Sequence, residues 1–214
     1  MSIGVLAFVP LLQLTAVSSA ASPPGSGPDT TYGRIDGDLG VVAGVGVTVG
    51  PHDPRGEVDL RFRYLDTAGL FVSYEDGALF GNGAEPLRVL AGGLEIRPLF
   101  LGRWLTGREF GSAPFDLLLD SLGVDLGMVF LQPAGGSFGD RPGLQLGLGV
   151  EFPILLRASG PWLGLHGGLR WSDAALAGAT VVDSADRAAY LSITLSWHQI
   201  FGAHAVDLND RAPR

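Results

Sequence analysis

Residues 57–64 read EVDLRFRY, a stretch in which charged and apolar side chains alternate without a break. Successive side chains of a β-strand point to opposite faces. An extended chain therefore carries Val58, Leu60, Phe62 and Tyr64 on one face and only charged residues on the other. A helix would mix the two groups, so this stretch predicts a β-strand.

The same alternation continues through most of the chain after Tyr32. Clusters of Gly, Pro, Asp and Asn separate the alternating segments, as turns require. With 57–64, the segments give about eight strands, which predicts an all-β fold closed as an antiparallel barrel. The other segments are 38–49, 70–75, 87–97, 123–132, 144–152, 163–171 and 190–201.

Alternation alone fits a soluble, lipocalin-like barrel with its apolar face inward, or a membrane barrel with its apolar face toward lipid. The polar face favours the membrane barrel, because it combines many glycines with isolated arginines and acids. Glycine is costly in an exposed strand, whereas inside a narrow barrel it leaves room for long charged side chains. The predicted lumen charge network is Asp38, Glu57, Asp59, Arg61, Arg63, Glu95, Arg97, Asp125, Glu151, His166 and Arg170.

Aromatic residues near segment ends suit the two interfacial girdles of such a barrel. The predicted interfacial aromatics are Tyr64, Trp104, Trp162, Trp171, Tyr190, Trp197 and Phe201. Long connections at 50–56, 76–86, 133–142 and 173–187 are expected outside the cell, and short turns at 66–69 and 157–161 in the periplasm.

One periplasmic connection, between Pro98 and Leu122, breaks this rule because it is long. Within it the apolar residues Phe115, Leu118, Leu119 and Leu122 share one helical face, and the acids Asp116 and Asp120 share another. Ser112 and Pro114 could begin that helix. We expect a short amphipathic helix over about 112–122 that either lies on the inner leaflet, helped by Trp104, or caps the barrel.

The first residues predict export. Ile3 to Val17 is an apolar run too short to span a bilayer, and small residues follow it. We interpret 1–21 as a signal peptide cleaved after Ala20 or Ala21, the alternative being an ordinary buried strand or helix. Residues 22–31 read as a flexible lead-in, 32–201 as the barrel and 202–214 as a polar C-terminal tail.

With a predicted signal peptide, about eight alternating strands and a last strand over 190–201 that ends in an aromatic residue, the chain resembles the small outer-membrane barrels of the OmpA/OmpX type. The resemblance is architectural and rests on no family-specific motif. It implies an outer-membrane location in a Gram-negative cell, with outer-membrane lipids and the barrel assembly machinery as partners. In many such proteins the terminal aromatic is the last residue, whereas here a tail follows Phe201.

Composition excludes several functions. The net charge of −8 and the absence of a basic stripe argue against nucleic acid as a partner. The chain contains no Cys, which rules out disulfides and thiolate chemistry. Its histidines, His52, His166, His198 and His204, show no metal-ligand spacing, and the acids of 76–85 lack the spacing of a calcium loop.

We therefore expect no catalytic residue, metal or cofactor. The predicted function is a structural or loop-binding barrel whose lumen is plugged by charged side chains. A small-solute conduit and a lipid-modifying hydrolase remain alternatives. The hydrolase is disfavoured because His166 should point inward and His198 with Ser196 should lie near the periplasmic end.

Overall fold

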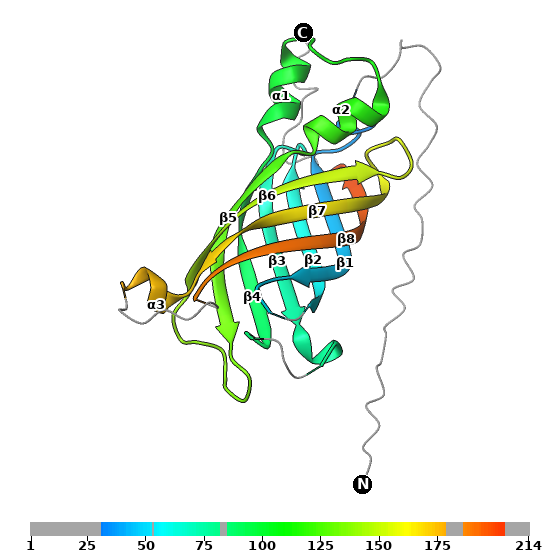
Figure 1. The fold of residues 1–214 in the computed structure, drawn as a ribbon. Coiled ribbons are helices and arrows are strands. Elements are labelled where there is room, and N and C mark those ends of the chain that lie inside the picture. The colour runs from blue at the N-terminus through cyan, green and yellow to red at the C-terminus, as the bar shows by residue number, and fades with distance from the viewer. Residues whose placement is uncertain (1–30, 53, 82–84, 179–185, 204–214) are drawn as a thin grey trace.

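The computed structural model describes residues 31–52, 54–81, 85–178 and 186–203. The predicted signal peptide, nearly all of the predicted lead-in and most of the predicted C-terminal tail lie outside these residues. Within them, the chain forms a closed barrel of eight antiparallel strands (Figure 1). The strands are β1 Leu39–Val49, β2 Arg55–Tyr64, β3 Ala68–Asp76, β4 Arg88–Ile96, β5 Gly123–Gln132, β6 Gly143–Pro153, β7 Gly160–Trp171 and β8 Arg187–Phe201.

Each strand pairs with its neighbour in the chain, and β8 pairs with β1 to close the ring. At the closing seam Leu39 lies opposite Phe201 and Val49 opposite Leu191. The expected eight-stranded antiparallel barrel is thus confirmed. Because the ring is closed, the sheet has no free edge strand that could pair with another chain and cause aggregation.

We call the end of the barrel that carries residues 31–38, 97–122 and 201–203 the termini end, and the opposite end the loop end. The described parts of the connections 50–54, 77–87, 133–142 and 172–186 lie at the loop end, and the short turns 65–67 and 154–159 lie at the termini end. The expected length difference holds for the other three loop-end connections, but the expected long connection at 50–56 is wrong. It spans only 50–54, because β2 already begins at Arg55.

The two faces of the barrel differ in polarity. Apolar side chains that alternate along the strands point outward, among them Phe62, Leu146 and Leu165, which are 46%, 43% and 45% exposed. The charged residues between them are buried inside. This is the reverse of the soluble alternative, which requires an apolar interior, and the lipocalin-like prediction is therefore wrong for these residues.

Within the described residues, apolar side chains form one buried cluster in the interior. Phe71, Val89, Ala91 and Val129 form a buried cluster on β3, β4 and β5, with Leu131 against it. Elsewhere the inward positions are largely charged, hydroxyl-bearing or glycine. The stabilising contacts of the lumen are consequently electrostatic over much of its length.

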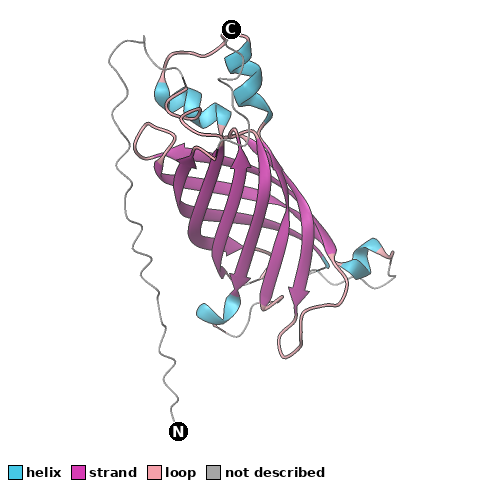
Figure 2. Ribbon diagram, turned by 180° about the vertical axis from the view of Figure 1, so that it is seen from behind, coloured by secondary structure: helices cyan, strands magenta, loops and turns pink. Residues whose placement is uncertain are grey.

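The long connection at the termini end holds two helices, α1 Pro98–Leu105 and α2 Ala113–Asp120. Figure 2 shows both beyond the barrel rim, at the end opposite η1 Gly77–Leu79 and α3 Asp173–Leu176. The expected helix is α2; α1 was not predicted. Ser112 occupies the cap position of α2 without a side-chain hydrogen bond, and its N–H instead donates to the carboxylate of Asp116. None of the helices in the described residues is long and apolar enough to cross a membrane.

Candidate functional site

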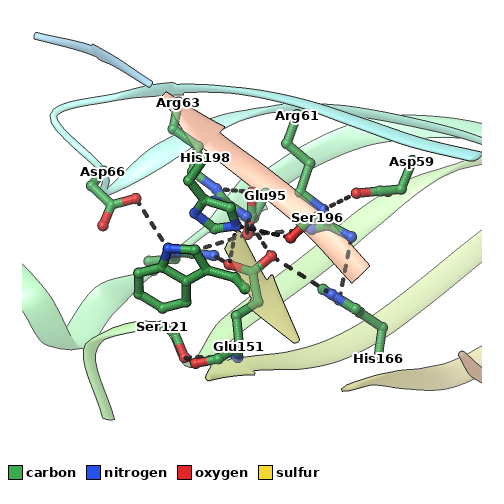
Figure 3. Close-up of polar contacts among 12 residues, drawn as sticks. Asp59, Arg61, Arg63, Asp66, Glu95, Ser121, Glu151, His166, Ser196 and His198 are labelled. Carbon is green, nitrogen blue, oxygen red and sulfur yellow. Dashed lines mark hydrogen bonds and ion pairs between the residues drawn. The ribbon is translucent and has the colours of Figure 1, made fainter. Parts of the chain in front are cut away.

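The part of the lumen nearest the termini end contains a compact group of arginines and glutamates (Figure 3). Arg63 Nε and Nη2 donate to both oxygens of Glu95, at 2.8 and 3.0 Å, and Nη2 also donates to Glu151 at 3.1 Å. Arg97 contacts the same two glutamates and reaches Asp66 at 3.2 Å. Shared, charge-assisted hydrogen bonds of this kind are the strong ones in proteins.

Arg61 lies one inward position further toward the loop end. Its Nε donates to Asp59 at 2.8 Å, and its Nη1 donates to Asp125 at 3.2 Å and lies 3.3 Å from Glu95. Arginine carries five donors in a fixed planar fork. Arg61 can therefore contact three carboxylates, from three strands, at the same time.

A second group lies nearer the loop end, around Glu75. Arg55 Nε donates to Glu75 at 2.8 Å, and Arg170 Nη1 and Nη2 donate to it at 3.1 and 2.5 Å. Arg170 Nε donates to Gln145 at 2.7 Å, and its guanidinium carbon lies 3.9 Å from the centre of the Tyr190 ring. Arg170 is thus held in place from three sides.

These contacts cross the bore. In a ring of eight strands, strands four apart face each other. The Arg63–Glu151 pair joins β2 to β6, and the Arg170–Glu75 pair joins β7 to β3, so both link facing strands. The lumen is therefore bridged at two levels by buried ion pairs.

Glycine makes room for these side chains. A Cβ added at Gly147 would lie 2.6 Å from the Tyr190 hydroxyl, and one added at Gly149 would overlap the His166 ring. Contacts this short are sterically forbidden, so larger residues cannot replace these glycines without moving the ring or the hydroxyl. The glycine-rich polar face thus has the role of leaving space within a filled barrel.

Two histidines lie beside Glu151. His166 Nε2 is 3.8 Å from Glu151 Oε1, and His198 Nε2 is 3.6 Å from Glu151 Oε2. Arg61 can only donate to His166 Nδ1, at 3.3 Å, so that nitrogen acts as an acceptor. His198 stacks on the Trp162 ring, with centroids 4.6 Å apart.

Ser196, His198 and Glu151 contain the residue types of a catalytic triad but not its arrangement. The Ser196 hydroxyl lies 3.1 Å from His198 Nε2, the same nitrogen that faces Glu151. A triad uses one ring nitrogen for the nucleophile and the other for the acid. Among the described residues, no cluster of three or more His, Asp or Glu side chains could hold a metal ion.

A separate ion-pair cluster lies outside the strands, where α2 meets residues 31–38. Arg34 Nη1 donates to Asp120 at 2.5 Å, Arg103 contacts both Asp116 and Asp120, and the Tyr32 hydroxyl donates to Asp116 at 3.0 Å. Burial and this hydrogen bond raise the pKa of Tyr32 to about 12. Burial opposes ionisation of Asp116, but hydrogen bonds led by the Phe110 N–H outweigh it and lower the pKa of Asp116.

The predicted lumen residues lie on inward positions, with two of them outside the arginine network. Glu57 accepts hydrogen bonds from the hydroxyls of Thr48 and Ser192. Asp38 lies at the rim of the termini end, where its carboxylate accepts the Ala203 N–H at 2.5 Å. The nine that take part in the ion pairs described above, or lie beside them, are Asp59, Arg61, Arg63, Glu95, Arg97, Asp125, Glu151, His166 and Arg170.

Two predicted interfacial aromatics lie in the lumen instead. Trp162 is 3% exposed and Tyr190 is 8% exposed. Trp162 has the same strand parity as His166, and Tyr190 the same parity as His198, so both must point inward. The structure leaves Tyr64, Trp104, Trp197 and Phe201 exposed and Trp171 partly buried.

The sequence analysis did not predict Arg55 and Glu75 as lumen residues, although both belong to the ion-pair group with Arg170. Arg55 was assigned to a loop, although it has the same parity as Arg61 and Arg63 and could have been added to their face. Glu75 lies near the end of a segment in which the apolar Phe71 and the polar Ser73 also point inward. The inward face of this segment therefore mixes apolar and polar residues, and alternation did not identify Glu75 as a lumen residue. In the cluster on α2, the shared helical face of Asp116 and Asp120 was visible in the sequence, but no periodic signal marked their partners Arg34 and Arg103.

Two small cavities lie among the side chains of the lumen. One, of about 10 Å³, is lined by residues that include Arg63, Trp162 and His198, and the other, also about 10 Å³, by residues that include Asp59, Arg61 and Tyr190. Each has room for about one water molecule.

No protein-family model matches the chain, and no curated protein matches it. Among solved structures, it is similar to Ail, the attachment invasion locus protein of Yersinia pestis, solved in complex with the heparin analogue sucrose octasulfate. The TM-score is 0.38 and the identity 8%, over 76% of this chain and 99% of that chain. The sulfated sugar analogue is a ligand of that protein.

Proposed function

We propose that this chain is an exported, non-enzymatic barrel of the outer membrane, with a lumen closed by ion pairs and a loop end available for surface contacts. The observation that carries the proposal is the pairing of Arg63 with Glu151 and of Arg170 with Glu75 across the bore. These bridges lie inside a barrel whose outward face is apolar. Lipid is the solvent that such an outward face requires.

The closed lumen distinguishes a structural barrel from a conduit. Two cavities of about 10 Å³ hold roughly one water each, whereas conduction needs a continuous aqueous path. Purified protein in planar bilayers is expected to give no steady conductance. Reproducible channels of uniform size from the parent protein would overturn the closed-lumen proposal.

A matched pair of variants sharpens that experiment. Replacing Arg63, Glu151, Arg170 and Glu75 together by Ser removes both bridges and is expected to open measurable conductance. Replacing the exposed Asp140 and Arg141 by Ser at the loop end leaves the lumen unchanged and should keep the parent behaviour. Unheated gel mobility checks that each variant is folded, since folded membrane barrels migrate differently from boiled ones.

The loop end supports the binding part of the proposal because a hydrogen bond links two of its connections. The Ala134 N–H donates to Glu85 at 3.2 Å, which ties the 133–142 connection to the 77–87 connection. Asp76 accepts from the Ala78 N–H at 2.9 Å and from Arg88 at 3.0 Å. Loops positioned by a rigid scaffold commonly carry binding residues.

Export is the remaining part of the proposal and rests on the N-terminal sequence. Envelope-purified protein is expected to begin at Ala21 or Ser22 by mass spectrometry. A mass that retains Met1, or recovery of the protein from the cytosol, would overturn the proposed location.

A further inference from the structure

The termini end carries an apolar surface outside the strands of the barrel. On α2, Phe115 and Leu119 are exposed, and Leu122 follows on the same helical face. Ile154, which follows β6 in the 154–159 turn, is also exposed. Large apolar side chains exposed together mark an interaction surface.

This surface continues the lipid-facing belt of the barrel. Leu122 directly precedes β5 and has the parity of its outward residues Leu126 and Met128. Ile154 directly follows β6 and has the parity of Leu148 and Phe152, which also point outward. The outward rows of both strands thus run without interruption into the 97–122 connection and the 154–159 turn.

The opposite face of α2 is polar and already occupied. Asp116 and Asp120 are buried, and Arg34, Arg103 and Tyr32 contact them. The helix therefore turns its acids toward residues 31–38 and its exposed residues Phe115 and Leu119 away from them. The two sequence-based alternatives, a cap and a membrane-surface helix, are compatible because they use different faces of α2.

We infer that the face formed by Phe115, Leu119, Leu122 and Ile154, here called the apolar collar, is inserted into the lipid leaflet at the termini end. The collar contacts the boundary between acyl chains and headgroups. Amphipathic helices lie at this boundary with their apolar side buried. Exposed Arg108 and Arg157 belong to the same connections and can reach headgroup phosphates while their stems stay in the apolar layer. This inference rests on the proposed membrane location of the barrel.

The absence of cysteine from the chain allows a direct test. Single cysteines at Phe115 and Leu119 are labelled with a nitroxide in proteoliposomes, and collisions with oxygen and with a water-soluble nickel chelate are measured. Leu148→Cys on β6 is the lipid reference, and Ser137→Cys in the 133–142 connection is the aqueous reference. All four side chains are at least partly exposed, so the label displaces no buried group.

Labels at Phe115 and Leu119 are expected to match Leu148, with frequent oxygen collisions and few nickel collisions. Nickel collisions as frequent as at Ser137 would show a collar in water and overturn the inference. Low collision rates with both reagents would show a collar covered by protein, from a second copy or another partner, and would overturn it as well. If Leu148 itself behaves like Ser137, the proposed membrane barrel fails; if only Phe115 and Leu119 do, the barrel proposal stands without the collar.

Discussion

Replacing Glu95 by Ala tests whether the buried ion pairs hold the barrel together. Glu95 is 2% exposed and accepts hydrogen bonds from Arg63 at 2.8 and 3.0 Å and from Arg97 at 3.1 Å. Charge-assisted hydrogen bonds contribute about 1.5–3 kcal/mol each. The free energies of the three lost hydrogen bonds do not simply add, because Arg63 and Arg97 both keep their ion pair with Glu151.

The expected loss is the cost of breaking a buried pair while leaving its cations behind, about 3–5 kcal/mol of unfolding free energy. With a urea dependence of about 2 kcal/mol per molar, the midpoint should fall by roughly 2 M. Unfolding is followed by tryptophan fluorescence in detergent micelles. Glu95→Asp keeps the charge and should lose less.

The matched control is Asp140→Asn, which removes an acid from an exposed connection. Its effect on the unfolding free energy should stay within about 0.5 kcal/mol. A Glu95→Ala midpoint equal to that of the control would refute the claim that lumen ion pairs stabilise the barrel.

Three further outcomes are expected. Leu146→Arg or Leu165→Arg places a charge on the outward face, and should cost about 2–4 kcal/mol and impair assembly into liposomes; an unchanged yield would argue against lipid at these positions. Brominated lipids should quench Trp197 and spare Trp162, so Trp197→Phe should reduce the quenching more than Trp162→Phe does. The raised pKa of Tyr32 means that its hydroxyl contributes stability fully below pH 10 and loses that contribution as pH rises through about 12; the tyrosinate absorbance lost in Tyr32→Phe should titrate there and not near pH 10.

Most of the sequence-based predictions about which side chains point into the lumen rest on the alternation of side chains along a strand. The alternation of 57–64 put Asp59, Arg61 and Arg63 on one face, because a strand has only two faces, and the structure buries all three. The same rule, applied to every residue, would have placed Trp162 and Tyr190 in the lumen. They were assigned to the interface from residue type alone, and a Trp or Tyr can stack on a lumen histidine or arginine as readily as it can lie among headgroups.

The sequence by itself determined the number of strands, their two faces and the helix near 113–120, since each follows from local periodicity. Only the tertiary structure decided which charges meet. Arg63 and Glu151 are 88 residues apart, and Arg170 and Glu75 are 95 apart, on strands that never pair in the sheet. Their contact depends on ring closure, strand tilt and the space left by glycines, none of which is a property of one segment. The fit of Arg34 and Arg103 to the α2 acids likewise depends on where the helices are placed over the barrel rim, so local pattern carried no trace of it.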